Sequence, residues 1–388
     1  MESAAPTSAI AHDKSADYPS RVLVQELIRG VNPLAKTTVL SVLILLLSGI
    51  IILGLAAYKE FSQNRRLNDE QNRHLAKLEE QITRTNQQVA ELTQSSQAIN
   101  AGLSLPTKLW SAYSGGVCLI SGTYVFIDPD SGRPLRLPKR KDGSLLRSEE
   151  QTQLTPEGDG EIAEVDYEGT GFYVGDGYIL TNQHIVVEPW KHDLWLKILE
   201  NFVNGKPRLI RLQAFFPGQS RSYPLKFKLA SSQDDLAVCT LNLKEVRKEI
   251  PILPLDQSAD VLIVGQAVTM MGYPSGADRL IALLPEKEAQ RLRERYGESG
   301  LALIGQLAQR DLVKPLTSQG HIMDLHPNQI IYDGITGEGE SGAPIFGPSG
   351  RVIGIHFGYF SQNRISNMAV PISRGLALLQ RAGWRPVE

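Results

Sequence analysis

Three short segments that lie far apart in this chain each carry one chemically capable polar residue. They read Thr181-Asn182-Gln183-His184, Asp234-Asp235-Leu236-Ala237-Val238 and Gly339-Glu340-Ser341-Gly342-Ala343-Pro344. Together they supply a base, a carboxylate and a nucleophile in the chain order His, Asp, Ser. These groups can act together only if the fold brings the three segments to one place, so they constrain the tertiary structure more than any other feature.

The chemistry assigns a role to each residue. A serine hydroxyl is a weak nucleophile until a base within hydrogen-bond reach takes its proton. We predict His184 as the base, Asp235 as the carboxylate that fixes its tautomer, and Ser341 as the nucleophile. Subtilisin-like enzymes and α/β-hydrolases carry these groups in other chain orders. The pattern Gly-x-Ser-x-Gly of α/β-hydrolases also fails here, because position 343 is alanine.

The negative charge that develops on the substrate oxygen requires N–H donors that are already in place. Gly339 lies two residues before Ser341, and a glycine lets the backbone turn its N–H inward. We predict the amides of Gly339 and Ser341 as the oxyanion hole.

The flanking sequences predict strands, and the fold class is all-β. Residues 169–174 and 178–181 read as strands joined by Gly175-Asp176-Gly177, a strong hairpin signal. Residues 236–241 and 352–357 read as further strands, which follow Asp235 and Ser341. Taken singly, a glycine-rich loop, a strand-end histidine and a strand-capping aspartate are each ordinary structural features. Their consistent order and context favour catalysis.

At this point the chain resembles the chymotrypsin-like serine peptidases, and two branches of them in particular. Residues 169–186, 235–238 and 366–371 resemble the HtrA/Deg proteases, whereas residues 332–358 are closer to the bacterial glutamyl endopeptidases. The resemblance covers about residues 107–383. It implies a chymotrypsin-like double β-barrel with the active site in the cleft between the barrels.

The same resemblance implies the division of residues between the barrels. The first barrel, about 107–245, carries His184 and Asp235, and the second, about 250–373, carries Ser341.

The glutamyl endopeptidase branch also implies a specificity pocket. A Thr before the nucleophile and a His after it there bind an acidic P1 side chain, and the matching positions here are Thr336 and His356. Viral chymotrypsin-like cysteine proteases use a similarly placed His for P1 Gln. We expect P1 Glu, or failing that Gln, to be preferred. The alternative is that His356 is a core histidine of its strand.

Glu340 differs from the residue found at this position in HtrA proteases and in trypsin-like zymogens. HtrA proteases usually have Asn there, and trypsin-like zymogens have an Asp that pairs with a newly cut amino terminus. The chain has no Ile-Val-Gly-Gly cleavage sequence. Activation by propeptide removal is therefore not expected.

Residues 37–58 carry no charge and follow an N-terminal tail, residues 1–36. At 1.5 Å per residue a helix of this length spans roughly 33 Å, enough for a bilayer core. The segment is longer than a signal-peptide apolar region and starts too far into the chain. We predict a single transmembrane helix that binds the lipid bilayer, with a buried core helix as the alternative.

The orientation of this helix is ambiguous. Three Lys or Arg residues lie within 20 residues before it and five within 20 after it, which by the positive-inside rule puts the C-terminal part in the cytoplasm. The family resemblance implies the opposite, a protease domain over residues 101–388 in the periplasm or an equivalent space. We adopt the second reading.

Residues 59–100 predict a helical linker with coiled-coil character. Apolar residues recur at heptad a and d positions, with Thr85 as a polar d: Leu75, Leu78, Ile82, Val89 and Leu92. About three heptads is the lower limit for a coiled coil. We expect a homo-oligomer, a trimer by resemblance to HtrA proteases. The alternative is a single helix that packs on the protease domain.

Two segments are additional to the strands that a minimal double barrel requires. Residues 128–165, rich in Pro, Gly and charge, predict an exposed loop, and residues 276–313 predict a helical insertion. The insertion is either a lid or activation sensor, or a plain surface helical pair.

The remaining features exclude other classes of function. Cys118 and Cys239 lie in apolar runs, which favours buried free thiols; the alternative is a single disulfide between them. His321 and His326 lack ligand partners at a useful spacing and are taken as loop residues, so neither a metal nor a cofactor is expected. A net charge of −2 and a pI of about 6.4 argue against nucleic-acid binding.

The sequence therefore predicts a membrane-anchored serine endopeptidase that acts on protein or peptide substrates through an acyl-enzyme. The rival prediction is a protease-fold scaffold or sensor that is catalytically silent or activated by oligomerisation.

Overall fold

The computed structural model describes residues 33–137, 154–192, 205–246, 249–258, 262–297, 300–359 and 366–386. Most of the predicted tail, and the middle of the predicted loop over 128–165, lie outside these ranges. The chain divides into two compact units, with the boundary after Gln94.

A single helix, α2 (Pro33–Tyr113), includes both the apolar segment and the predicted heptads. Within the described residues it is the one helix long and apolar enough to cross a membrane, with a mean hydropathy of 2.9 in its most apolar window. The heptad side chains are exposed, from 43% for Leu78 to 69% for Leu92. Apolar side chains on this helix are thus available to another surface.

The first sheet has seven antiparallel strands in the order β5-β4-β1-β2-β3-β7-β6. Their bounds are β1 (Val117–Ile127), β2 (Glu164–Tyr173), β3 (Tyr178–Asn182), β4 (Lys206–Phe215), β5 (Tyr223–Pro224), β6 (Lys226–Ser231) and β7 (Leu236–Thr240). The predicted hairpin joins β2 to β3, with Asp176 at φ 50° and glycines on either side also at positive φ. A left-handed turn of this kind suits Asp and Gly.

This first sheet is a half-barrel, with β5 and β6 as its end strands. β5 is only two residues long and ends in Pro224, which has no N–H to donate to a neighbour. The second sheet is a closed barrel in the order β10-β13-β12-β11-β8-β9. Its strands are β8 (Ala267–Gly272), β9 (Leu316–His326), β10 (Gln329–Tyr332), β11 (Pro344–Phe346), β12 (Val352–Tyr359) and β13 (Asn367–Pro371).

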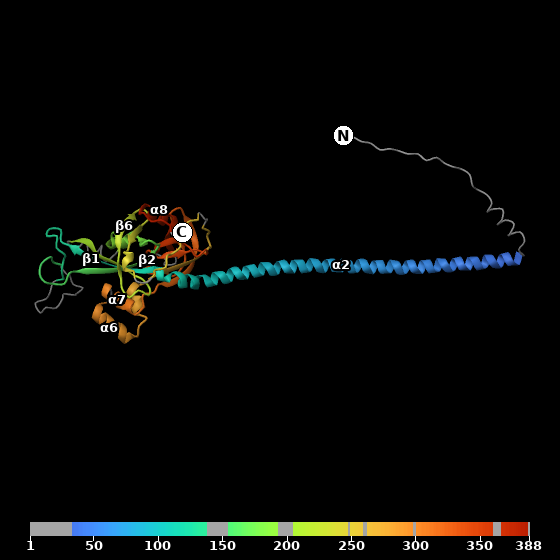
Figure 1. Ribbon diagram of the computed structural model, residues 1–388, viewed down its shortest axis with the longest axis horizontal. Coiled ribbons are helices and arrows are strands. Elements are labelled where there is room, and N and C mark those ends of the chain that lie inside the picture. The colour runs from blue at the N-terminus through green and yellow to red at the C-terminus, as the bar shows by residue number, and fades with distance from the viewer. Residues whose placement is uncertain are drawn as a thin grey trace, which may run out of the picture. The chain divides into compact units, whose positions relative to one another are not determined.

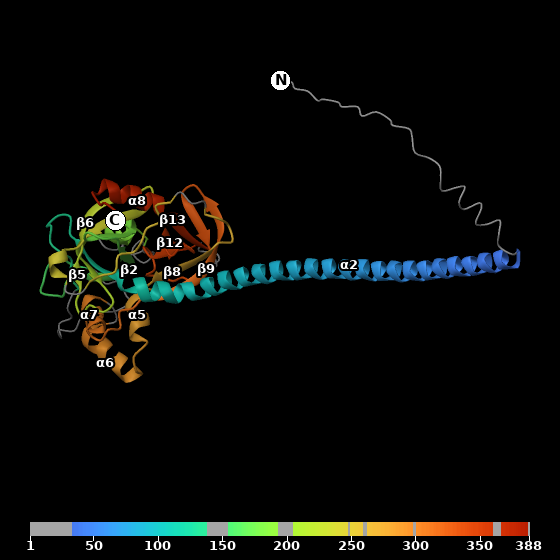
Figure 2. The same cartoon turned by 45° about the vertical axis from the view of Figure 1, so that its right-hand side comes forward.

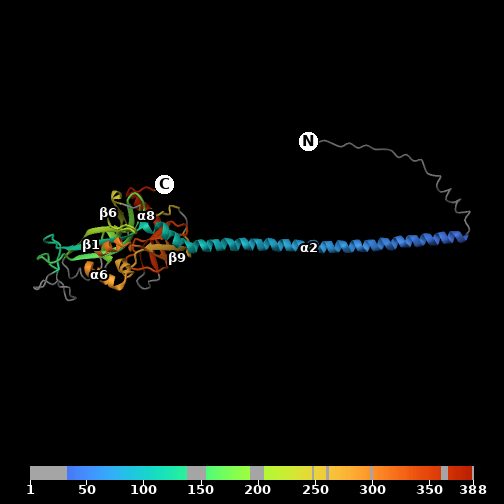
Figure 3. The same ribbon diagram turned by 60° about the horizontal axis from the view of Figure 1, so that its bottom comes forward.

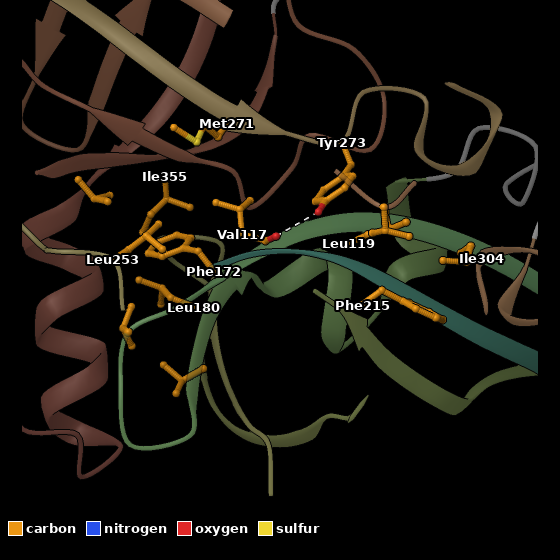
Figure 4. Packing of buried hydrophobic residues seen from close by; sticks show 14 of the residues in the cluster. Val117, Leu119, Phe172, Leu180, Phe215, Leu253, Met271, Tyr273, Ile304 and Ile355 are labelled. Atoms are coloured by element: carbon orange, nitrogen blue, oxygen red, sulfur yellow. Dashed lines mark hydrogen bonds between the residues drawn. The ribbon is translucent and has the colours of Figure 1, made fainter. Parts of the chain in front are cut away.

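One hydrophobic core joins the two sheets. Val117, Phe172 and Leu180 of the first sheet share a buried cluster with Met271 and Ile355 of the second (Figure 4). The hydroxyl of Tyr273, which follows β8, donates to the carbonyl of Val117 at 3.1 Å. Burial of this apolar surface holds the edges of the two sheets together.

Helices cover opposite sides of the sheets, with α6 on one side and α8 on the other in all three views (Figures 1, 2 and 3). The insertion forms α5 (Gly276–Ile281), α6 (Glu286–Tyr296) and α7 (Leu301–Gln309), and α8 (Ile372–Arg381) ends the domain. The shorter helices are η1 (Ser114–Gly116), α3 (Gln183–Val186), η2 (Pro189–His192) and η3 (Leu243–Glu245). Leu280, Leu292 and Leu303 of the insertion are buried in the shared core. The insertion is therefore part of the core rather than a surface pair.

Three smaller expectations have clear outcomes. Cys118 and Cys239 are buried and free, as predicted. The prediction that His321 and His326 lie in a loop is wrong, because β9 is long enough to pair with both β8 and β10 and includes both residues. Part of the predicted exposed loop is also buried, since Leu135 packs in a cluster with Tyr124 and Phe126.

Candidate active site

His184 and Asp235 meet at one edge of the first sheet. β3 pairs with β7 in a register that sets Asn182 opposite Leu236, so the residues just beyond each strand end are adjacent. The imidazole Nδ1 of His184 lies 2.7 Å from Oδ2 of Asp235, and the His184 backbone N–H donates to Oδ1 at 3.0 Å. An ionised carboxylate only accepts, so the ring proton sits on Nδ1 and the lone pair on Nε2.

Asp235 adopts an uncommon backbone conformation, with φ at 50°. Its carbonyl accepts hydrogen bonds from the Asn182 side chain at 2.8 Å and from the Gln183 N–H at 3.0 Å. Asp tolerates the left-handed region better than most residues. These bonds fix the carboxylate with respect to the short helix that carries His184.

The Ser341 turn requires glycine at two positions. Gly339 has φ 91° and Gly342 has φ 89°. A Cβ on Gly342 would lie 2.0 Å from the carbonyl oxygen of Thr170, and one on Gly339 would lie 2.6 Å from that of Tyr273. The turn can therefore pack against the first sheet only with glycine in both places.

Thr170 of β2 ties this turn to the first sheet. Its N–H donates to the Ser341 carbonyl at 2.9 Å, and its hydroxyl donates to the Gly339 carbonyl at 2.7 Å. The Thr170 carbonyl in turn accepts a hydrogen bond at 2.7 Å from the hydroxyl of Thr181, which lies three residues before His184. The nucleophile candidate and the base candidate are thus anchored on the same two strands.

The peptide groups before Gly339 and Ser341 have defined directions. The Glu338 carbonyl accepts the Ser275 N–H at 2.6 Å, and the Glu340 carbonyl accepts the Ala343 N–H at 2.9 Å. No peptide bond in the described residues is cis. In a trans peptide the N–H points opposite to the C=O, so the amides of Gly339 and Ser341 face away from these partners.

Glu340 is buried beside the nucleophile candidate. Glu340 is only 1% exposed, and its Oε2 accepts the Gly337 N–H at 2.7 Å. Burial raises the pKa of this carboxyl from 4.5 to about 7, while the Gly337 bond and the Arg279 charge act in the opposite direction. The carboxyl thus changes charge near neutral pH.

His356 is a buried histidine on β12, next to the site. Its Nδ1 lies 2.8 Å from the Tyr332 hydroxyl. Burial and the nearby His184 lower its pKa to about 3, so the ring is neutral at neutral pH. The structure therefore brings His356 within electrostatic range of His184.

Thr336, the second predicted specificity residue, hydrogen-bonds through its hydroxyl to Oδ1 of Asn367 on β13. The Asn367 amide nitrogen donates to the Gly334 carbonyl at 3.0 Å, so Oδ1 is the atom left to accept. β13 also pairs with β12, where Ala369 lies opposite His356. Tyr332 and Asn367 escaped notice in the sequence because their partners are set by barrel packing.

A cavity of about 400 Å³ borders Gly339. Four carboxylates line it, those of Asp166, Glu168, Asp278 and Glu338. No group of three or more His, Cys, Asp or Glu residues in the described part of the chain is arranged to hold a metal ion.

The two packed antiparallel sheets have the trypsin-like peptidase fold. A family model for the trypsin-like peptidase domain matches residues 169–355, which include His184, Asp235 and Ser341. The chain is a serine endopeptidase with a trypsin-like peptidase domain over these residues.

The chain is also similar to several solved structures. They include the active form of the Rv3671c protease from M. tuberculosis, with 14% identity over 72% of this chain and 86% of that chain and a TM-score of 0.40. A serine endoprotease from Yersinia pestis shows 14% identity over 71% and 66% with a TM-score of 0.41. Deg5 shows 16% identity over 71% and 91% with a TM-score of 0.39. No curated protein matches the sequence.

Proposed function

We propose that this chain is a membrane-anchored endopeptidase that cleaves proteins through a Ser341–His184–Asp235 triad. The observation that carries the proposal is the pair of hydrogen bonds that the Asp235 carboxylate accepts, one from the ring Nδ1–H and one from the backbone N–H of His184. It leaves Nε2 as the atom that takes a proton, on a histidine anchored to the strands that also hold the Ser341 turn.

In the proposed reaction His184 Nε2 removes the Ser341 hydroxyl proton as Oγ attacks the scissile carbonyl. The amides of Gly339 and Ser341 bind the oxyanion. The imidazolium then gives its proton to the leaving amine, and the acyl-enzyme is hydrolysed by water in the reverse sequence. Asp235 stabilises the imidazolium through the Nδ1 hydrogen bond and remains ionised.

For the P1 side chain the geometry supports Gln over Glu, although the sequence put Glu first. Sulfur is a weak acceptor, so the Tyr332 hydroxyl gives its proton to Nδ1 of His356 rather than to the Met270 sulfur. The neutral His356 ring then carries its proton on Nε2, and a P1 carbonyl oxygen competes for the ring proton with the Met368 backbone, which also hydrogen-bonds to this ring.

The Thr336 hydroxyl completes this argument. Its proton is already used toward Asn367, so toward substrate it can only accept. A Gln amide offers one oxygen that accepts and one nitrogen that donates, whereas a Glu carboxylate offers acceptors alone. A carboxylate would also meet no positive charge on His356, because its pKa is about 3.

The N-terminal part supports the remaining features of the proposal. The apolar residues 37–58 cross a bilayer as the first part of α2, with the protease domain on the periplasmic or equivalent side. The exposed heptads support association of α2 with copies of itself, in a trimer by analogy with HtrA proteases.

The test is cleavage of a peptide library by the full chain in detergent, beside the Ser341→Ala variant. Loss of a triad nucleophile is expected to lower turnover by about 10⁶-fold. Cleavage after Gln that disappears in Ser341→Ala supports the proposal. Equal cleavage after Ala, Val and Gln contradicts the specificity, and cleavage that persists in Ser341→Ala contradicts the triad.

A further inference from the structure

A carboxylate of the first sheet caps the helix α5. Ala277, the second residue of α5, donates its N–H to Oε2 of Glu168 on β2 at 2.6 Å. Ser275 occupies the usual capping position, but it has φ 53° and ψ 17°, and its side chain makes no capping hydrogen bond. The first N–H groups of a helix have no partner within the helix. Glu168 therefore supplies the cap from a distant part of the chain.

The contact between Glu168 and α5 is close enough to require a glycine. A Cβ on Gly276 would lie 1.5 Å from Oε2 of Glu168, and Gly276 itself has φ 45°. The other carboxylate oxygen, Oε1, is buried and has no hydrogen-bond partner among the described residues. The Ala277 N–H is thus the hydrogen-bond donor that fixes this carboxyl.

Ser275 connects the cap to the predicted oxyanion hole. Its N–H donates to the Glu338 carbonyl at 2.6 Å. That carbonyl belongs to the same peptide group as the N–H of Gly339, and in a trans peptide the two point in opposite directions. The hydrogen bond from Ser275 therefore sets the direction of the Gly339 amide.

Glu168 and Thr170 act on the two sides of Gly339. They are two residues apart on β2, so their side chains leave the same face of the strand. The Thr170 hydroxyl donates to the Gly339 carbonyl at 2.7 Å, whereas Glu168 binds the start of α5, whose preceding residue binds the Glu338 carbonyl. One strand face thus fixes the peptide groups before and after Gly339.

The backbone at Ser275 needs support from its surroundings. Its φ of 53° lies in the left-handed region, which is unfavourable for a residue other than glycine and persists only where neighbouring structure holds it. Gly339 has φ 91°, and a glycine rotates readily once its neighbours release it. Loss of the Glu168 acceptor would therefore let Ser275 relax and withdraw its N–H from Glu338.

The charged groups that face the Glu168 carboxyl are Asp278 of α5 and Asp166 of its own strand. Burial raises the pKa of Glu168 to about 7, and the two aspartates add to the rise, whereas the Ala277 hydrogen bond lowers the pKa. A protonated carboxyl keeps an oxygen that can accept. Kinetics at about pH 9, where the carboxyl is ionised, therefore report its position rather than its protonation.

We propose that Glu168 is a positioning residue for the oxyanion hole: it caps α5, the cap holds Ser275 in its left-handed turn, and the Ser275 N–H directs the Gly339 amide toward the oxyanion. The start of the helical insertion is then a required support of the catalytic turn. The role rests on the proposed function only in that Gly339 binds the oxyanion.

Glu168→Met removes the acceptor with little change in side-chain length. The oxyanion exists only in the transition state, so we expect a lower kcat with KM little changed. Loss of one oxyanion donor costs about 10²–10³-fold in kcat, and we expect a fall of at least ten-fold when the donor is misdirected. The measurement is peptide hydrolysis by the full chain in detergent, at about pH 9.

Two variants accompany Glu168→Met. Glu168→Gln keeps an oxygen that can accept the Ala277 N–H, and we expect its kcat within about three-fold of wild type. Glu164→Met makes the same substitution at an exposed residue of the same strand, whose carboxylate binds Arg211 of β4, and serves as the matched control. A Glu168→Met protein with the kcat of Glu164→Met overturns the proposal. So does an equal loss in Glu168→Gln, or a loss that appears in KM alone.

Ser275→Gly tests whether Glu168 acts through the left-handed turn. Glycine adopts this conformation without strain and keeps the N–H, so the turn no longer depends on the cap. We expect Glu168→Met to lower kcat by only about three-fold in this background. An equal loss in both backgrounds overturns the proposal. If Glu168→Met does not fold, Glu168→Asp, which withdraws the carboxylate by one methylene, takes its place.

Hydrogen exchange of the peptide covering residues 337–341 gives a readout that does not need turnover. We expect faster exchange in Glu168→Met than in Glu164→Met, also when both carry Ser341→Ala. Unchanged exchange in that pair overturns the proposal. Faster exchange in a protein that cleaves no peptide supports the positioning role and contradicts only the proposed function.

Discussion

The hydroxyl of Thr170 donates to the carbonyl of Gly339 at 2.7 Å, although the two residues are 169 positions apart in the chain. The same hydroxyl accepts the Tyr273 N–H at 3.2 Å. One buried side chain of the first sheet thus connects the Ser341 turn with the segment after β8. The relative position of nucleophile and base depends on this connection.

Thr170→Val tests that dependence. Valine has nearly the same shape, but it leaves the Gly339 carbonyl and the Tyr273 N–H without this partner. An unsatisfied buried group costs about 1–3 kcal/mol, so we expect a lower Tm and a fall in kcat of at least ten-fold. Both quantities are measured on the purified protein, by thermal denaturation and peptide hydrolysis.

The matched control is Thr123→Val. Thr123 is also a buried threonine of the first sheet, and its hydroxyl donates to Asp166 at 2.6 Å rather than to a residue of the Ser341 turn. We expect a lower Tm with kcat retained. A Thr170→Val protein whose kcat matches that of Thr123→Val would show that the connection has no catalytic role.

Asp235→Asn tests the orientation of His184. The amide keeps the shape of the carboxylate but places a donor against the imidazole, which favours the wrong tautomer. We expect kcat to fall by about 10⁴-fold with little change in fold or KM. Steady-state kinetics and circular dichroism measure the two effects, and a fall of less than ten-fold would contradict the assignment.

Glu340 makes the stability of the domain depend on pH. Its pKa is about 7 in the folded protein against an ordinary 4.5, so the folded state binds the extra proton between these values. Stability is therefore greater below pH 4.5 and is lost as the pH rises through 7. The contribution is about 3 kcal/mol.

We expect Glu340→Gln to reduce the loss of unfolding free energy between pH 5 and pH 8 by about that amount. Chemical denaturation at the two pH values measures it. Glu338→Gln, which removes an exposed carboxylate of the same turn, is expected to leave the difference unchanged. A Glu340→Gln protein with the wild-type pH dependence would mean that Glu340 does not titrate in this window.

Tyr332→Phe tests the proposed P1 pocket. Without the Tyr332 hydroxyl, Nδ1 of His356 loses its donor and the proton is no longer directed to Nε2. We expect kcat/KM for a P1 Gln peptide to fall about ten-fold, the loss of one buried hydrogen bond, while P1 Ala changes little. Equal losses for both peptides would indicate a structural role for Tyr332.

Leu78→Glu/Ile82→Glu tests association through α2. Both side chains are exposed and lie on the predicted seam. Charges at seam positions oppose helix pairing, so we expect the 59–388 fragment to sediment as an oligomer and its variant as a monomer. Lys77→Glu, outside the seam, is the control. A wild-type fragment that is monomeric would contradict the proposed assembly.

Local sequence was enough for the elements around the site. The Asp-Gly turn between β2 and β3 was predicted from residues that are neighbours in the chain. The half-open form of the first sheet was not, because its end strands β5 and β6 follow one another in the chain and only the curvature of the sheet decides whether they pair. The burial of the insertion could not be predicted either. The periodicity of apolar residues shows which face of a helix is apolar, but not what packs against that face.

The sequence by itself determined the candidate catalytic residues and their order: His184, Asp235 and Ser341 stand beside strands whose ends had to meet. The tertiary structure decided what surrounds them. Thr170 at the Gly339 carbonyl and Asn367 at Thr336 are contacts between segments that only sheet packing brings together. Hydrogen bonds act over a few ångströms in space. The number of residues between two positions in the chain does not reveal how far apart they lie in the folded protein.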